Sequence, residues 1–266
     1  MIRAVVRFGG GPGRDFPLAS LIDGGARCRP AQDKVREAVL RNVLAPIHPD
    51  GWRFIAIAAL TSVLLFALWD PLGWLGIVAT LWCAYFFRDP WRVTPVREGL
   101  VIAPADGLVV SVDRAPPPPQ LGMGEAAMTR IGIFLNVLDV HINRVPMSGR
   151  VTKLAYHPGK FLNASLDKAS EENERMAIRL ATAEGADIAF VQVAGLIARR
   201  IICNLVEGQE VIAGQRFGLI RFGSRTDVYL PPAWTPLAVA GQHVLGGETV
   251  IADARCQEPP RQGVVH

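Results

Sequence analysis

The 266-residue chain is poor in cysteine, and its cysteines form no pattern. The four stand singly, at Cys28, Cys83, Cys203 and Cys256. Neither the paired spacing of a zinc site nor the cysteine framework of a secreted disulfide domain is present. We therefore expect reduced thiols and no bound metal.

A tract of basic residues is missing as well. The formal net charge of +4 is mild, and the Lys and Arg residues are scattered along the chain. This pattern disfavours nucleic acid as a partner, and it fits a weak attraction to an anionic membrane surface.

A secretory signal is also absent from the first part of the chain. Residues 1–45 lack the charged start, the apolar middle and the small-residue cleavage site of such a signal. They are rich in Gly, Arg and Pro and show no steady period. We expect a disordered extension here, or a stretch that lies upstream of the true start.

No apolar run reaches the ~20 residues that a membrane-spanning helix usually needs, but two shorter runs are adjacent. Phe54–Trp69 and Leu72–Phe87 are almost uncharged and are separated only by Asp70 and Pro71. Tryptophans lie near their ends and arginines follow the second run, as is typical of a membrane interface. We expect residues 46–95 to form a helical hairpin that crosses or dips into the cell membrane, with the remaining domain facing the cytoplasm. A buried soluble helix pair is the alternative.

Beyond Pro95 the sequence changes to short β-type runs that glycine and proline interrupt. The proline-rich stretch Ala115–Gln120 predicts a loop, and the polar stretch Ser165–Arg175 predicts a short helix or loop over a site. The expected fold class is mainly β (α+β), an antiparallel, barrel-like β-sheet catalytic domain over residues 96–266 preceded by the apolar helical hairpin. The expected strands lie within Val101–Val112, Arg130–Val137, Gly149–Ala155, Ile188–Ala194, Ile197–Val206, Phe217–Leu230 and Thr249–Asp253.

The segment Arg216–Pro231, RFGLIRFGSRTDVYLP, places a Gly-Ser pair between two apolar strand halves. Such a pair is most often only a tight turn. Glycine also permits the distorted backbone that brings a serine hydroxyl onto the preceding carbonyl carbon, which a β-branched residue would obstruct. The bond between Gly223 and Ser224 is therefore a candidate for self-cleavage through an N-to-O acyl shift.

Seven further stretches accompany the Gly-Ser segment. They are PIHPDGW, FFRDPWRVTP, APADGLV, DVHINRVPMSG, YHPGKFLNASLDKASEENER, VEGQEVIAGQRFG and VAGQHVLGGETVIA. In these stretches and their order, the sequence resembles the phosphatidylserine decarboxylases, in their short, membrane-anchored bacterial and archaeal form. The resemblance covers about Ile47–Ala254 and leaves residues 1–45 outside.

The resemblance implies a proenzyme that cuts itself between Gly223 and Ser224. The products would be a large chain, 1–223, and a small chain, 224–266, which remain together as a heterodimer in one fold. Ser224 would become a covalent pyruvoyl group, a pyruvate cofactor that makes pyridoxal phosphate unnecessary. Its ketone would form a Schiff base with phosphatidylserine among the membrane lipids, giving carbon dioxide and phosphatidylethanolamine in phospholipid biosynthesis.

Two other side chains receive catalytic roles from the resemblance. His141 would be the base and proton donor, with an ordinary imidazole pKa near neutrality. Without the resemblance, a lone histidine beside a strand is more often structural. Asp106 would be the carboxylate that orients His141, although the sequence alone favours a turn residue before Gly107.

Binding of the substrate head group is expected in the stretch HPGKFLNA. There His157, Lys160 and Asn163 offer polar groups, and a cation could meet the lipid phosphate or the substrate carboxylate. A solvated loop explains the same residues equally well. No role is assigned to the remaining histidines, His48, His243 and His266.

The chain departs from the family pattern at two places. Many relatives have a Leu-Gly-Ser-Thr type of sequence where this chain has FGSR at 222–225. Longer-chain relatives have a second histidine three places after the one matching His141, where this chain has Arg144. If that second histidine is the catalytic base in the longer-chain relatives, His141 or another residue must act as the base here.

Two alternatives involve different chemistry. A membrane-bound serine hydrolase would use Ser224, His141 and Asp106 as a triad, although the G-x-S-x-G elbow is absent. A carrier or binding module is suggested by APADGLV and GQ-x-V-x-GGETV, which resemble the hairpins of biotinyl and lipoyl domains. No lysine of this sequence stands at a suitable hairpin tip.

Overall fold

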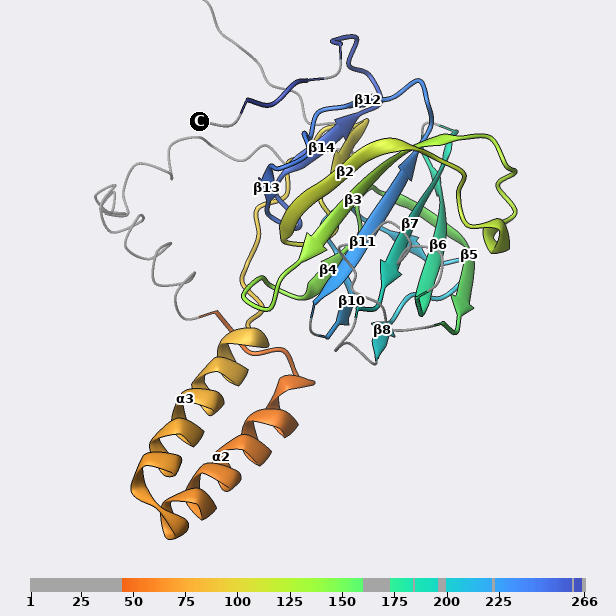
Figure 1. Ribbon diagram of the computed structural model, residues 1–266. Helices are drawn as coiled ribbons and strands as arrows, with labels where there is room; N and C mark the ends of the chain where they lie inside the picture. The colour runs from red at the N-terminus through yellow and green to blue at the C-terminus, as the bar shows by residue number, and fades with distance from the viewer. Residues whose placement is uncertain are drawn as a thin grey trace, which may run out of the picture. The chain divides into compact units, whose positions relative to one another are not determined.

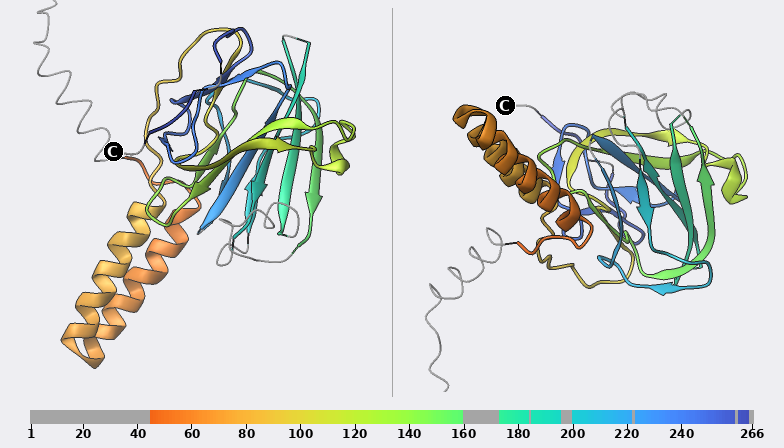
Figure 2. Two further views of the ribbon diagram at one scale, coloured as in Figure 1. Left: turned by 45° about the horizontal axis from the view of Figure 1, so that its top comes forward. Right: turned by 90° about the horizontal axis from the view of Figure 1, so that it is seen from below.

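The computed structural model describes residues 45–159, 173–183, 185–195, 200–221, 223–259 and 261–264. Two apolar helices come first, α2 at Gly51–Leu68 and α3 at Asp70–Phe86, and antiparallel β-structure follows (Figure 1). The helices lie side by side and extend from one end of the β-structure (Figure 2). The expected disordered extension lies outside the described residues apart from Ala45, as does most of the polar stretch expected to form a helix or loop.

A single residue, Trp69, separates the two helices. Its backbone is extended, with φ −171° and ψ 126°. Asp70 and Pro71, which we expected between the helices, form the first turn of α3 instead. Proline suits that position because the first helical N–H groups have no partner within the helix, and an acidic side chain favours a helix N-terminus.

Small residues let α2 and α3 approach closely. A Cβ on Gly76 would lie 2.9 Å from the Cα of Ser62, nearer than real Cβ contacts allow. The hydroxyl oxygens of Ser62 and Thr80 are 3.0 Å apart, within hydrogen-bond distance across the two helices. Close backbone approach through small residues with a polar contact is typical of helix pairs in lipid.

The outward faces of the helices are apolar and exposed. Leu68, Trp74 and Leu81 are 77%, 64% and 65% exposed. Of the described helices, α2 is long and apolar enough to cross a membrane, and only 11% of it is buried, which argues against the alternative of a buried soluble pair. Its 18 residues would span about 27 Å at 1.5 Å per residue, close to the hydrocarbon thickness of a bilayer. The helices are therefore consistent with membrane association.

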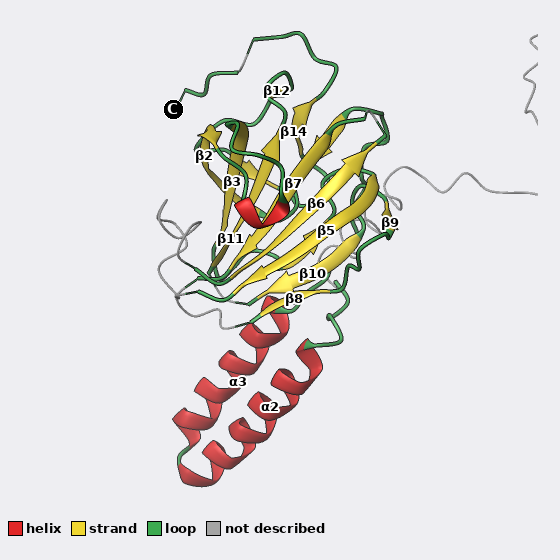
Figure 3. Cartoon of the chain, turned by 90° about the vertical axis from the view of Figure 1, so that its right-hand side faces the viewer, coloured by secondary structure: helices red, strands yellow, loops and turns green. Residues whose placement is uncertain are grey.

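The β-structure consists of three antiparallel sheets. The largest has eight strands in the order β13-β2-β3-β11-β7-β6-β5-β9 and curls around the interior (Figure 3). Two three-stranded sheets, β1-β14-β12 and β4-β10-β8, complete the domain. The strands are β1 (Leu100–Ile102), β2 (Gly107–Ala115), β3 (Met128–Leu135), β4 (Ile142–Arg144), β5 (Gly149–His157), β6 (Arg175–Thr182), β7 (Asp187–Val193), β8 (Ile201–Cys203), β9 (Glu210–Val211), β10 (Arg216–Ile220), β11 (Ser224–Leu230), β12 (Thr235–Pro236), β13 (His243–Val244) and β14 (Val250–Asp253), with a 3₁₀ turn, η2 (Pro119–Leu121).

The main hydrophobic core lies between the three sheets. Ile131, Ile178 and Val228 of the eight-stranded sheet pack together with Phe217 of β10 and Ile251 of β14. A smaller cluster on the other face of the large sheet includes Leu121 of η2. Because side chains alternate between the two faces of a strand, both faces of β11 are buried.

The expected fold class, a mainly β domain after an apolar helical pair, is confirmed by this arrangement. Two expected strands are each divided. Val101–Val112 is interrupted between β1 and β2, and Phe217–Leu230 is interrupted between β10 and β11. Strand β6 was not expected, because its mixed sequence RMAIRLAT shows no clean alternation of apolar and polar residues.

Candidate active site

The expected cleavage bond lies where the chain passes from one sheet to another. β10 ends at Ile220 beside β4 and β8, and β11 begins at Ser224 beside β3 and β7. Between them Gly223 has a φ of +58°, a left-handed conformation that costs a residue with a Cβ about 1–2 kcal/mol. A Cβ on Gly223 would meet no described atom within 4 Å. The backbone conformation, and not a lack of space, therefore favours glycine here.

Ser224 is fully buried at the start of β11. Its Oγ has no hydrogen-bond partner among the described residues. Leaving a buried hydroxyl unpaired costs about 1–3 kcal/mol, so such groups are rare in a folded protein and are often reactive. The hydroxyl is therefore free to act as a nucleophile, directly after the left-handed glycine.

His141 is 1% exposed and also has an unpaired atom. Its Nδ1 lies 2.9 Å from the carbonyl oxygen of Asp139, so Nδ1 donates the proton and Nε2 carries the free lone pair. The pKa of His141 is lowered to about 4, chiefly because burial disfavours the charged imidazolium; the hydrogen bond to Asp139 opposes this shift, and the charge of Arg88 adds to it. The ordinary pKa expected from the sequence is thus wrong, because the imidazole is desolvated. At neutral pH it is a neutral base.

The topology brings His141 and Ser224 to the same end of the domain. Ser224 pairs with Leu135, the last residue of β3, and the next six residues of the chain lead to His141. The carbonyl of His141 in turn accepts a long hydrogen bond, 3.4 Å, from the backbone N–H of Ile220. Both residues therefore flank the connection between β10 and β11.

Asp106 has other partners than the one expected. Its Oδ2 accepts a hydrogen bond from Arg92 Nη2 at 2.6 Å, and its Oδ1 accepts one from the Gly246 N–H at 2.8 Å. Burial raises the pKa of Asp106, while Arg92 and the Gly246 N–H oppose the rise. Among the described contacts Asp106 makes no hydrogen bond to His141, because a backbone carbonyl already occupies Nδ1. The structure thus places Ser224 and His141 at the two sides of the same connection, and no described contact joins Asp106 to either of them.

Asp139 is a site residue that the sequence reasoning missed. Its carbonyl fixes the tautomer of His141, and its side chain accepts a hydrogen bond from the Asn136 N–H at 2.9 Å. Its carboxylate also lies 3.5 Å from Nε2 of His243, to which we had assigned no role. The sequence offered one sign of this role: Asp139 stands two residues before His141, and an aspartate at that position can hold the loop that carries the histidine.

The base of the helical hairpin forms a wall of the site. The ring of Phe86, at the end of α3, lies 4.2 Å from the ring of His141. Phe86 packs edge-on against Phe87, and Phe87 stacks on Phe54 of α2. These rings join Val140, Ile142 and Leu219 in one buried cluster. The site is therefore continuous with the ends of the two apolar helices.

Comparisons of the sequence with known proteins identify its family. Residues 79–252 match the family model for phosphatidylserine decarboxylase. The phosphatidylserine decarboxylase proenzyme of Paramagnetospirillum magneticum is 58% identical over 220 residues, which is 83% of this chain and 92% of the relative. Those of Cereibacter sphaeroides and Ruegeria pomeroyi are 54% and 52% identical, over 85% and 83% of this chain and 97% and 99% of the relatives. The chain belongs to the phosphatidylserine decarboxylase family. It is thus an enzyme of a carboxy-lyase family, and not a carrier module.

Arg144, the position at which the sequence was expected to depart from longer relatives, makes only structural contacts among the described residues. Its guanidinium donates to the carbonyls of Gly214 and Pro90, each at 3.0 Å, and lies 3.4 Å from Asp89. These contacts tie β4 to the segment after α3. The contacts of Arg144 are therefore structural, and its guanidinium is not a candidate base.

The head-group residues expected from the sequence are not joined to the site by any described contact. His157 ends β5, which β6 and β7 separate from β11. Lys160 and Asn163 lie outside the described residues. Among the residues that the structure describes, no group of three or more His, Cys, Asp or Glu side chains could hold a metal ion.

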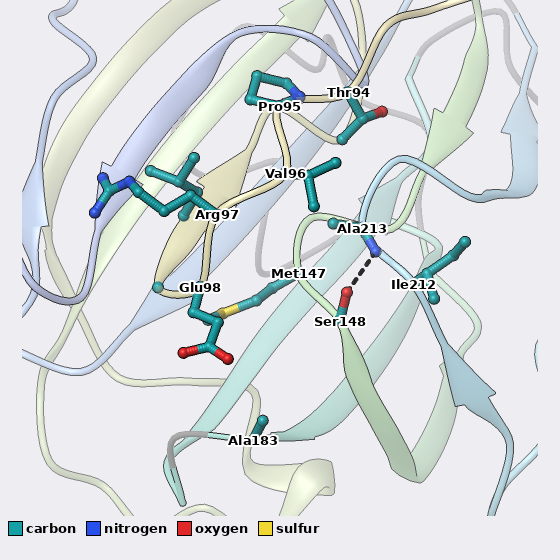
Figure 4. A pocket seen from close by; sticks show the side chains of 12 residues that line it. Thr94, Pro95, Val96, Arg97, Glu98, Met147, Ser148, Ala183, Ile212 and Ala213 are labelled. Atoms are coloured by element: carbon teal, nitrogen blue, oxygen red, sulfur yellow. Dashed lines mark hydrogen bonds between the residues drawn. The ribbon is translucent and has the colours of Figure 1, made fainter. Parts of the chain in front are cut away.

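A cavity of about 360 Å³ lies elsewhere, between the segment 94–100 and the turn that contains Ile212 (Figure 4). Its lining is mainly apolar. The two charged side chains beside it are paired, Arg97 with Asp253 and Glu98 with Arg255. Ser148 accepts a hydrogen bond from the Ala213 N–H at 3.0 Å. The cavity thus offers no free nucleophile or base, and the connection between β10 and β11 remains the candidate active site.

Proposed function

We propose that this chain is a phosphatidylserine decarboxylase that matures by cutting itself between Gly223 and Ser224. The observation that supports this most is the buried Ser224 hydroxyl, which has no described hydrogen-bond partner and follows a left-handed glycine. The neutral imidazole of His141 belongs to the same end of the domain. The relatives are named proenzymes, which fits a chain that is made inactive and then processed.

Self-cleavage begins with attack of Ser224 Oγ on the carbonyl carbon of Gly223. His141 Nε2 is the candidate acceptor for the hydroxyl proton, and the nitrogen of residue 224 receives a proton as the amide becomes an ester. Loss of the Ser224 α-proton then expels the carboxylate of Gly223 and gives dehydroalanine. Water hydrolyses this group with release of ammonia, so that pyruvate caps the chain that begins at position 224. General-base help of this kind is worth ~10²–10⁴ in rate.

A pyruvoyl group at position 224 supplies a ketone for the substrate amine and an amide carbonyl that withdraws the electrons released when carbon dioxide leaves. The chain's own residues hold that position. Arg225 pairs with Phe134 of β3 on one side and with Val193 of β7 on the other. His141 is the candidate proton donor after decarboxylation, because a bound substrate carboxylate would raise its pKa.

The two products remain in one fold under this proposal. Residues 224–230 form a central strand of the large sheet, so cutting before Ser224 removes no strand pairing. The exposed apolar helices would attach the enzyme to the cell membrane, with the β domain on the cytoplasmic side. Asp106 is proposed as a positioning residue that supports the site through Arg92 and Gly246.

The serine hydrolase alternative has less support. It requires a carboxylate that orients His141, and the described Nδ1 contact is to a backbone carbonyl. A hydrolase would also keep an intact chain.

The test is an assay with vesicles that contain phosphatidylserine, without added pyridoxal phosphate or metal. We expect carbon dioxide and phosphatidylethanolamine from the wild-type protein and neither product from Ser224→Ala. Full activity in a protein whose residue 224 remains an unblocked serine would contradict the proposal.

A further inference from the structure

Arg221 reaches the base of the hairpin from the connection between β10 and β11, and the charges of Arg53 and Arg200 act on it. We refer to Arg53, Arg200 and Arg221 as the arginine cluster. The guanidinium carbon of Arg221 lies 4.7 Å from the ring centre of Phe54. Arg53 is the neighbour of Phe54 in the first turn of α2, and its side chain is 75% exposed. The charges of Arg200 and Arg53 both act on Arg221.

The cluster has more positive than negative charge. Asp50 is the only carboxylate whose charge acts on Arg221 among the described groups, and it already lies 3.3 Å from Arg53. Burial lowers the pKa of Arg221, and the charges of Arg200 and Arg53 lower it further. The Nε of Arg221 is buried and has no hydrogen-bond partner among the described residues. An anion bound between these side chains would relieve both the repulsion and the missing hydrogen bond.

The position of the cluster indicates which anion it meets. Arg221 is three residues before Ser224 in the connection that carries the candidate cleavage bond. Phe54 and Arg53 belong to the base of the apolar hairpin, where a membrane-attached protein meets the lipid head groups. In a membrane-attached protein, lipid phosphates would lie within reach of the cluster. Guanidinium groups are suited to phosphate because two of their N–H groups can bind two phosphate oxygens at once.

We propose that the arginine cluster binds the phosphate of an anionic glycerophospholipid and so positions its head group beside residue 224. This inference rests on the proposed function, because it names the residues that would hold the substrate of the same site. The phosphate takes the charge-assisted hydrogen bonds of Arg221, while Arg53 and Arg200 attract the anionic lipid along the membrane surface.

The binding test uses the purified, matured full-length protein in micelles, titrated with short-chain phosphatidylglycerol. This lipid carries the phosphate and the negative charge but has no amine to react. The variants are Arg221→Gln and Arg53→Gln, and the control is Arg150→Gln. Arg150 is also exposed, at 63%, and lies on β5, three strands from β11. A parallel titration with inorganic phosphate separates a lipid site from a site for free phosphate.

We expect the dissociation constant for phosphatidylglycerol to rise about tenfold in Arg221→Gln, the effect of losing a charge-assisted hydrogen bond, and severalfold in Arg53→Gln. Arg150→Gln should match the wild type, and inorganic phosphate should bind far more weakly than the lipid. Equal lipid affinity in the wild type and both cluster variants would overturn the proposal. Inorganic phosphate binding as tightly as the lipid would overturn its assignment to a lipid.

Turnover of phosphatidylserine gives a second readout. KM should rise in Arg221→Gln with kcat nearly unchanged, because the phosphate does not change during decarboxylation. A normal KM combined with a low kcat would contradict a binding role. The two proposals can be told apart. If the wild type binds phosphatidylglycerol through the cluster but does not decarboxylate phosphatidylserine, the proposed function is wrong and the lipid site is still supported.

Discussion

The ring of Phe86 packs on the imidazole of His141, with ring centres 4.2 Å apart and ring planes inclined by 36°. Phe86 is the last residue of an apolar helix and is 1% exposed. It therefore helps to keep water from the histidine, and that desolvation is the main cause of the low pKa of His141. The base of the hairpin consequently contributes to the candidate site.

Replacing Phe86 should change the pH dependence of maturation. Phe86→Leu leaves space beside the imidazole, so water should enter and the pKa of His141 should rise toward its ordinary value. A larger fraction of His141 is then protonated at pH 5, and self-cleavage should slow there by severalfold while remaining near the wild-type rate at pH 8. The rate is followed by denaturing gel on freshly made chain. Trp74→Leu, an exposed position on the same helix, is the control, and identical pH profiles for all three proteins would contradict this role.

His141 should also make stability depend on pH. Its pKa is about 4 in the folded protein and about 6.5 when unfolded. Between these values the unfolded chain binds more protons, so the free energy of unfolding rises with pH. This contribution is complete above about pH 6.5 and is lost as the pH falls toward 4, by on the order of 3 kcal/mol. Denaturation of uncut Ser224→Ala, with and without His141→Gln, checks it. A pH dependence that His141→Gln leaves unchanged would contradict the assignment.

The sequence was sufficient for the parts of the fold that depend on local pattern. The uncharged runs predicted the helices, and alternation with Gly and Pro breaks predicted most long strands. The sequence could not show that the chain passes from one sheet to another at Gly223, because the pattern RFGLIRFGSRTDVYL predicts one strand with a turn residue inside. The sheet to which each half belongs depends on partners such as Ile142 and Leu135, far away in sequence.

For the candidate site, the Gly-Ser pair and the family resemblance pointed to Ser224 and His141, and their roles stay predictions. Partners that depend on tertiary packing could not be predicted. Asp106 belongs to a buried pair with Arg92, one of the arginines that follow the second apolar run. The pKa of His141 likewise depends on burial beneath Phe86 and on the carbonyl of Asp139. The sequence pattern around His141 does not predict that burial.

Asp106 and Arg92 should act as a pair. The two side chains are 9% and 10% exposed, and removing one partner of a buried ion pair typically costs about 3–5 kcal/mol because the other charge is left unpaired. Asp106→Asn and Arg92→Met should therefore lower stability and slow self-cleavage to a similar extent. The double variant should be less destabilised than the sum of the two. If Asp106→Asn stopped cleavage while Arg92→Met did not, Asp106 would act on the reacting atoms directly and not through Arg92.

Two deletions of the hairpin should have different outcomes. Removing 54–87 takes away Phe54, Phe86 and Phe87, which belong to the buried cluster beside His141. That protein should be unstable and remain uncut. Replacing only residues 60–77 by a short turn keeps these rings and removes most of the exposed apolar surface. The shortened protein should be released from membranes, fold and cut itself. Membrane fractionation and gels report both properties, and full self-cleavage after deletion of 54–87 would show that the rings are dispensable.

The central claim is that Ser224 is the point of self-cleavage, and the intact mass of the purified chain under denaturing conditions tests it most directly. We predict two chains, one ending at Gly223 and one covering 224–266, the latter with the mass of a pyruvoyl group in place of serine and no free amino terminus. Ser224→Ala should give a single full-length mass. A wild-type protein that decarboxylates phosphatidylserine as one uncut chain, or that is cut at another bond, would contradict the account.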